Sequence, residues 1–164
     1  MKSKFLKSLI LATLVPFAGA SGAPVSFKKS GIKQPKLKFS DNGKFRILHL
    51  TDIHEVDPEM DDDENRDIPR DKSIEAMNVI KKSIEKTNPD LVVFGGDNIS
   101  GYWEEFTYDY ISKTIDKITA PIREKNIPFA IVFGNHDSEI IKNFRDFQML
   151  LYMQYDNFIG CLNA

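Results

Sequence analysis

The segment "PFAIVFGNHD", residues 128–137, joins an apolar run to an amide, an imidazole and a carboxylate. A short, continuous apolar run is typical of a strand in a parallel sheet. Asn135, His136 and Asp137 begin where such a strand should end. Gly134 allows the backbone to turn sharply there, because glycine carries no side chain that would clash. The segment therefore predicts a buried strand whose carboxyl end presents polar side chains.

Two earlier segments have the same arrangement. Residues 45–50, "FRILHL", predict a first strand, and Asp52 and His54 follow it directly. Residues 90–94, "DLVVF", predict a second strand, and two glycines and Asp97 come next. Each of the three apolar runs is therefore followed by side chains that can bind a ligand or a metal.

Helical patterns separate the three predicted strands. The first runs from Asp71, as N-cap, to Asn88-Pro89, where proline ends it. Its apolar side chains recur at helical spacing and are Ile74, Met77, Ile80 and Ile84. A second pattern covers residues 104–125, with a break expected near Pro121, and a third covers residues 140–155. This alternation predicts an α/β fold with a mostly parallel sheet.

The length of 164 residues suits one domain. We expect a linker at residues 21–35 and the folded domain at residues 36–164. Asn42-Gly43 lies between two alternating apolar runs, which is a signal for a β-hairpin before the first strand. The single cysteine, Cys161, excludes an internal disulfide and a zinc site built from cysteines.

The formal net charge of −2 argues against nucleic-acid binding, which normally needs a basic patch to release counterions. Residues 1–20 have the pattern of a signal peptide: lysines, then an apolar stretch, then Ala18-Gly19-Ala20 as a cleavage site. We therefore expect a protein exported to the periplasm or secreted. The apolar stretch is too short to span a bilayer, so no membrane association is expected after cleavage.

The three strand ends define a candidate site. Ligands of open parallel sheets bind beyond the carboxyl ends of the strands, so these polar residues should meet at one rim. The residues expected there are Asp52, His54, Asp97, Asn135 and His136. Carboxylate, amide and imidazole groups without a thiolate form a mixed oxygen and nitrogen ligand set, which suits Mn, Fe or Zn. The sequence therefore indicates a metal centre.

Two neighbouring metal ions would bind a phosphate ester and activate a water molecule. Asp97 has two oxygens and could bridge them, while His136 could protonate the leaving oxygen and Asp137 could orient that imidazole. Each residue alone also has a structural interpretation: Asp52 and Asn135 suit turns, and Asp137 could cap the following helix. The occurrence of the whole set at three strand ends favours the metal centre.

The stretches "LTDIH", "VVFGGDN" and "VFGNHD" resemble the D-x-H, G-D and G-N-H-D/E motifs of the calcineurin-like metallophosphoesterases. The resemblance implies hydrolysis of phosphate esters on a two-sheet αββα sandwich with two metal ions. It implies that Asp52 and His54 bind the first metal, that Asp97 bridges and that Asn135 binds the second. His136 would be the catalytic histidine, with Asp137 beside it. Purple acid phosphatases have a tyrosine three residues after the bridging aspartate, where this chain has Ser100, so a tyrosine-ligated iron is not expected.

The chain departs from the family in its histidines. It has three, His49, His54 and His136, whereas the family has a further histidine and a G-H-x-H motif on a second sheet. We interpret His49 as a packed strand residue. The resemblance then covers a β-α-β-α-β half of the sandwich with one partial metal site at best, which suggests a truncated protein. Two functions stay open: a phosphoesterase, or an inactive fragment or pseudoenzyme that binds metal weakly or pairs with a chain supplying the missing half.

The half of the sandwich that the resemblance covers would leave one apolar face of its sheet open, and such a face would favour self-association.

The acidic segment "EVDPEMDDDEN", residues 55–65, lacks the glycine and closing glutamate of an EF-hand. We interpret it as a solvated loop beside the metal rim, with a weak Ca²⁺ or Mn²⁺ site as the alternative.

Overall fold

The computed structural model describes residues 35–55, 70–100, 108–138 and 144–160. The predicted signal peptide and linker, most of the acidic segment and Cys161 lie outside these ranges. In chain order the elements are β1 (Ile47–Leu50), α1 (Arg70–Thr87), β2 (Leu91–Phe94), α2 (Tyr108–Arg123), β3 (Phe129–Ile131), the 3-10 helix η1 (His136–Ser138) and α3 (Phe144–Tyr152). The alternation of strands and helices predicted from the sequence is confirmed.

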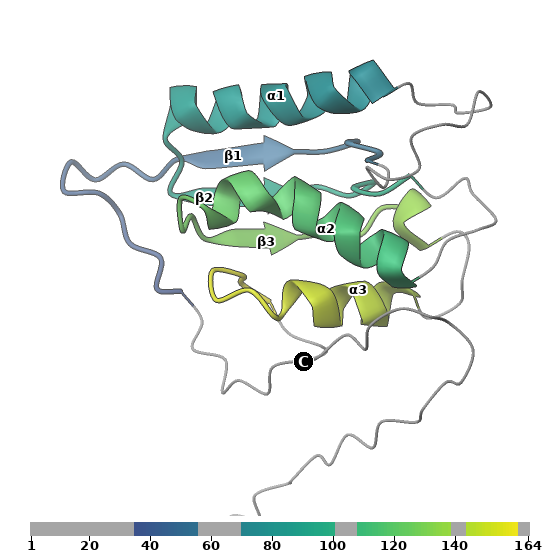
Figure 1. The fold of residues 1–164 in the computed structure, drawn as a ribbon. Helices are drawn as coiled ribbons and strands as arrows, with labels where there is room; N and C mark the ends of the chain where they lie inside the picture. The colour runs from purple at the N-terminus through teal and green to yellow at the C-terminus, as the bar shows by residue number, and fades with distance from the viewer. Residues whose placement is uncertain (1–34, 56–69, 101–107, 139–143, 161–164) are drawn as a thin grey trace, which may run out of the picture.

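The strand β2 lies in the middle of a three-stranded sheet and pairs in parallel with both β1 and β3. In the register of the sheet, Leu48 lies beside Val92, and Val92 lies beside Phe129. Figure 1 shows α2 crossing the sheet, with α1 beside β1 and α3 beside β3. The predicted α/β fold with a parallel sheet is therefore correct.

The core lies between one face of the sheet and the three helices. Its fully buried members from the strands are Val92, Phe94 and Phe129, and the helices add Ile84, Ile115, Ile122 and Tyr152. The rings of Phe94 and Phe129 meet edge to face, with centroids 6.0 Å apart. Burying aromatic rings in this way removes a large apolar area from water, so this cluster supplies much of the stability of the sheet.

The opposite face of the sheet is apolar and exposed. Ile47 in β1 is 59% exposed, and Val132, directly after β3, is 57% exposed. His49 is also exposed, with its ring over Gly95, so the interpretation of His49 as a packed residue is only partly right. An exposed aliphatic surface on a sheet is the feature expected of half of a sandwich.

Both long helices end at an asparagine in the left-handed conformation. Asn88 follows α1 with φ of 41°, and Asn126 follows α2 with φ of 51°. The Asn88 N–H donates to the Ile84 carbonyl at 2.9 Å, which satisfies one of the last free carbonyls of α1. Asparagine tolerates this backbone conformation better than most residues. The predicted end of the first helix at Asn88-Pro89 is confirmed.

Several sequence expectations need correction. The turn at Asn42-Gly43 forms, with the Ser40 N–H donating to the Lys44 carbonyl, but residues 35–40 form no strand, so no hairpin is completed. Pro121 lies inside α2 without ending it, and the helix continues to Arg123. Asp71 is within α1 rather than its N-cap. Ile74 is exposed, since the buried side of α1 passes through Ser73, Ile80 and Ile84 and Ile74 lies beside it. None of the described helices combines the length and apolarity needed to cross a bilayer.

We predict that Phe129→Ala lowers the free energy of unfolding by about 3–5 kcal/mol, because it removes a fully buried ring and leaves a cavity. Val132→Ala is the matched control, because its side chain follows the same strand but is exposed; its cost should stay below about 1 kcal/mol. Urea unfolding of the two variants measures both values. Equal losses would show that the core does not lie on the Phe129 face.

Candidate metal centre

Backbone pairing continues beyond the carboxyl ends of β1 and β2. The Asp52 N–H donates to the Gly96 carbonyl at 3.1 Å, and the His54 N–H donates to the Asp97 carbonyl at 2.9 Å. These bonds hold the loop after β1 directly against the loop after β2. The side chains of His54 and Asp97 are therefore brought together by the backbone itself.

Three of the residues at this rim have a strained backbone. Asp52, His54 and Asp97 have φ of 55°, 48° and 50°, in the left-handed region that non-glycine residues rarely adopt. Such conformations cost on the order of 1–3 kcal/mol each and persist only where the surroundings impose them. Their concentration at the two adjacent strand ends is an independent sign of a functional site.

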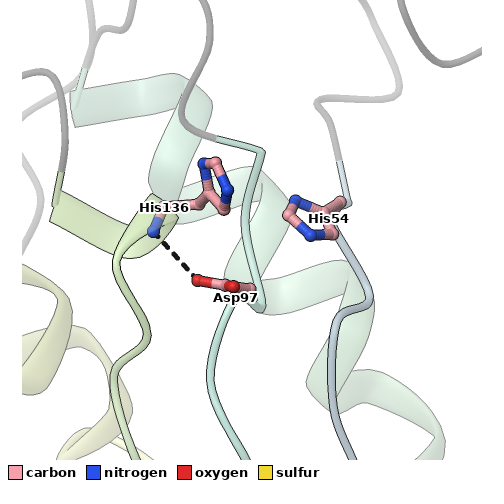
Figure 2. A group of neighbouring side chains, drawn as sticks. All are labelled: His54, Asp97 and His136. Atoms are coloured by element: carbon pink, nitrogen blue, oxygen red, sulfur yellow. Dashed lines mark hydrogen bonds between the residues drawn. The ribbon is translucent and has the colours of Figure 1, made fainter.

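His54, Asp97 and His136 form the core of the site, which Figure 2 shows. Each offers one ligand atom, and these atoms all lie within 4.8 Å of one another. The two imidazole rings lie edge to face, with centroids 4.9 Å apart. The His136 backbone N–H donates to Oδ1 of Asp97 at 2.9 Å, which holds the carboxylate close to both rings. The three side chains come from three different strand ends, as the sequence predicted.

This group fits a divalent metal ion. Two imidazoles and one carboxylate are ligands that Zn, Mn and Fe accept, and their atoms are close enough to converge on one ion. All three residues are partly buried, so the side chains are held by packing while the site can still be reached from solvent. We expected His136 to act as a catalytic residue; in the structure it also belongs to the group that could hold the metal.

Two glycines allow the loops to approach this closely. Gly96 has φ of 106°, and a side chain there would meet the backbone nitrogen of Gly134 at 2.8 Å. A side chain at Gly134 would collide with the carboxylate of Asp97. Glycine is therefore required at both positions. A side chain would not fit at either one, and the backbone conformation of Gly96 also favours glycine.

Asp137 is buried and joins the loops after β2 and β3. Its carboxylate accepts hydrogen bonds from the backbone N–H groups of Asn98 at 2.8 Å, Ile99 at 3.0 Å and Gly134 at 2.8 Å. Burial raises the pKa of the Asp137 carboxyl, while the three backbone donors oppose that rise. This carboxylate therefore holds two loops of the rim in place. Its expected role toward the His136 imidazole stays a prediction.

Asp52 and Asn135 are exposed. Oδ2 of Asp52 accepts a hydrogen bond from the Thr51 hydroxyl at 2.7 Å, and the side chain lies outside the group of His54, Asp97 and His136. Asn135 directly precedes η1 at the same rim. Their roles as metal ligands stay predictions.

Sequence reasoning missed one residue of this region. Glu55 follows His54, and we expected it to be solvated with the rest of the acidic segment, but its side chain is buried and pairs with Lys117 at 2.9 Å. The expectation was wrong for Glu55 because its side chain bonds to Ser73 of α1 and Lys117 of α2. No local signal identifies this burial, because the partner Lys117 is 62 residues away.

We predict that Asp137→Asn lowers the free energy of unfolding by about 1–3 kcal/mol. An amide keeps one acceptor oxygen but turns an NH₂ group toward a backbone N–H, so at least one buried donor loses its acceptor. The control is Asp156→Asn, at an exposed position after α3, which should change stability little. Urea unfolding that finds the two variants equally stable would contradict the proposed link between the loops.

Comparison with known proteins agrees with this geometry. A profile of the calcineurin-like phosphoesterase family matches residues 45–164, which includes all three strands and the whole rim. The chain belongs to the calcineurin-like phosphoesterase family. No solved structure matches the chain in a search of known structures.

Curated relatives carry phosphatase names. The chain is 29% identical over 165 residues to "Probable inactive purple acid phosphatase 14" of Arabidopsis thaliana, covering 99% of this chain and 40% of that protein. It is 33% identical to "Probable inactive purple acid phosphatase 29" of the same plant, over 63% of this chain and 26% of the relative. It is 31% identical to "Phosphatase DCR2" of Saccharomyces cerevisiae, over 63% of this chain and 18% of the relative. The chain thus spans less than half the length of these relatives.

Proposed function

We propose that this chain provides the first part of a metal-dependent phosphoesterase site and takes part in the hydrolysis of phosphate esters. The observation that carries the proposal is the convergence of the ligand atoms of His54, Asp97 and His136 within 4.8 Å. They come from three parallel strands of a calcineurin-like phosphoesterase. Membership of this family supports the proposal that the site uses metal ions and that its substrates are phosphate esters.

The roles of the residues follow from their positions. Asp97 lies close to both imidazoles and would bind metal with one or both oxygens, and His54 would add a nitrogen ligand. Asp52 and Asn135 are the proposed further ligands from the same rim. A bound Mn, Fe or Zn ion would draw charge from a phosphate oxygen and make a bound water more acidic. His136 would then donate a proton to the leaving oxygen or bind the metal, two roles that compete for one imidazole.

A second candidate is a catalytically inactive chain that binds metal weakly or completes its site with another chain. Two relatives whose names include "probable inactive" favour it. The three histidines of the sequence also favour it, because His49 is not part of the metal group and only His54 and His136 contribute imidazoles to it. The truncation expected from the sequence stays a prediction.

The exposed sheet face supports a proposal about partners. Ile47 and Val132 lie on one apolar face, and such a face is normally buried against another layer. We propose that it associates with a second copy of the chain, or with a chain that supplies the missing sheet.

Export is the proposed location. The lysines, apolar stretch and small residues within positions 1–20 support a cleaved signal peptide and a periplasmic or secreted protein. Determination of the amino-terminal residue of the protein recovered outside the cytoplasm tests this proposal. A terminus at Ser21 is expected, and retention of residues 1–20 inside the cell would contradict it.

We predict that Mn²⁺ raises the unfolding temperature of the full chain and that Asp97→Asn abolishes the rise. A ligand that binds only the folded state stabilises it by RT ln(1 + [L]/Kd), about 2.7 kcal/mol at a hundredfold excess over Kd. The control is Asp109→Asn, an exposed position on α2 that pairs with Lys113, which should respond to Mn²⁺ as the wild type does.

Hydrolysis of p-nitrophenyl phosphate by the Mn²⁺-loaded chain then separates the two candidate functions. Metal-dependent activity that is lost in Asp97→Asn would support the enzyme. Metal binding without activity would support the inactive chain. An unfolding temperature that is indifferent to Mn²⁺ would contradict the enzyme and the weakly metal-binding chain, and would leave only a chain whose site is completed by another chain.

We predict that the wild type self-associates as its concentration rises and that Val132→Lys suppresses this association. A lysine charge on the apolar face opposes burial against another layer. Val79→Lys is the matched control, because Val79 is 60% exposed on α1, away from that face. Sedimentation velocity measures the association. A monomeric wild type, or equal effects of the two lysines, would rule out self-association through the sheet face.

A further inference from the structure

A buried polar cluster lies directly behind the candidate metal centre. Oε1 of Glu55 accepts a hydrogen bond from the Ser73 hydroxyl at 2.7 Å and pairs with Nζ of Lys117 at 2.9 Å. Nζ of Lys117 also donates to the Ser73 hydroxyl at 2.7 Å. Ser73 belongs to α1 and Lys117 to α2, so three separate segments meet at this triangle. We refer to Glu55, Ser73 and Lys117 as the anchor cluster.

The cluster is well protected from water. The Glu55 side chain is 1% exposed and that of Lys117 is 23% exposed. Moving a carboxylate out of water is costly, and apolar residues of similar volume often stabilise a fold as well as a buried ion pair does. Simple stability therefore does not explain why charged residues occupy this place.

The backbone of Glu55 is also fixed on both sides. Its N–H donates to the Asn98 carbonyl at 3.1 Å, and its carbonyl accepts from the Ser100 N–H at 2.9 Å. Glu55 is therefore tied to the loop after β2 by its backbone and to two helices by its side chain. The residue before it, His54, is a member of the metal group and has a strained φ of 48°.

A strained residue keeps its conformation only when its neighbours impose it. The hydrogen bond from the His54 N–H to the Asp97 carbonyl restrains His54 on one side. On the other side, the anchor cluster restrains Glu55, the residue that follows His54. Together they leave the chain little freedom to relax His54 to an ordinary backbone conformation.

We propose that the anchor cluster is a positioning device that holds His54 in its left-handed conformation beside Asp97. None of its residues touches the reacting atoms in this account, so all three are positioning residues. The consequence for metal affinity rests on the proposed function; the effect on the His54 backbone does not. The close contact of Ser73 with Lys117 could also suggest a nucleophile, but Ser73 is 6% exposed and cannot be reached by a substrate.

The first test is amide hydrogen exchange of the full chain without metal. In Lys117→Met, which keeps the length of the side chain but removes its charge, the His54 and Glu55 amides should exchange about tenfold faster. The amides of Val92 and Phe94 in β2 should keep their protection. Lys113→Met is the matched control, since Lys113 lies one turn earlier on α2 and pairs with Asp109 instead. Unchanged exchange at His54 in Lys117→Met would overturn the proposal.

A double variant separates positioning from stability. Glu55→Leu with Lys117→Met removes both buried charges, so its unfolding temperature should be close to that of the wild type. If the cluster positions His54, the His54 amide still exchanges rapidly in this variant, because the leucine does not bond to Ser73. Recovery of slow exchange together with stability would show that packing alone suffices and would overturn the proposal.

The second test is Mn²⁺ affinity, measured by titration calorimetry. Lys117→Met should raise Kd about tenfold or more, as loss of a group that orients a metal ligand does, while Lys113→Met should leave it unchanged. Equal affinity in the wild type and Lys117→Met would overturn the link to the metal. If the wild type binds no Mn²⁺, the proposed function fails, whereas hydrogen exchange still decides whether the cluster positions His54.

Discussion

The parallel pairing of β2 with β1 on one side and β3 on the other is the constraint on which the rest of the structure depends. Because all three strands run in the same direction, their carboxyl ends meet at one edge of the sheet. Hydrogen bonds from the Asp52 and His54 N–H groups extend this pairing into the loops. These backbone hydrogen bonds bring His54 and Asp97 together, so the site does not depend on side-chain contacts alone.

The rim combines strain, close backbone approach and buried carboxylates. Asp137 binds three backbone N–H groups of two loops, and Glu55 binds side chains of two helices. Glu55 directly follows His54 in the sequence, and Asp137 directly follows His136. The bonds of these two carboxylates form without a ligand, which reduces the ordering that a metal ion would have to impose. Such an arrangement suits either an enzyme or an inactive metal-binding chain.

Local patterns in the sequence predicted much of this arrangement. The short apolar runs identified all three strands, and the order of polar residues after them placed His54, Asp97 and His136 at one rim. Contacts between distant residues could not be predicted in this way. Nothing local to Glu55 indicates that it is buried, because that depends on Lys117 in a helix 62 residues later. The Asn42-Gly43 signal predicted the turn correctly, but a hairpin also needs a first strand with a partner to pair with, and residues 35–40 do not form one.

The central proposal is that the group formed by His54, Asp97 and His136 holds a metal ion. X-ray absorption spectroscopy of the zinc-loaded full chain tests it most directly, because the outer scattering of an imidazole ring identifies histidine ligands. We predict nitrogen and oxygen ligands at about 2.0–2.1 Å, with imidazole scattering that falls in His54→Gln. A further fall when His136→Gln is added would show that His136 binds the metal instead of serving as the proton donor. A shell of oxygen ligands alone, unchanged by either substitution, would contradict the account.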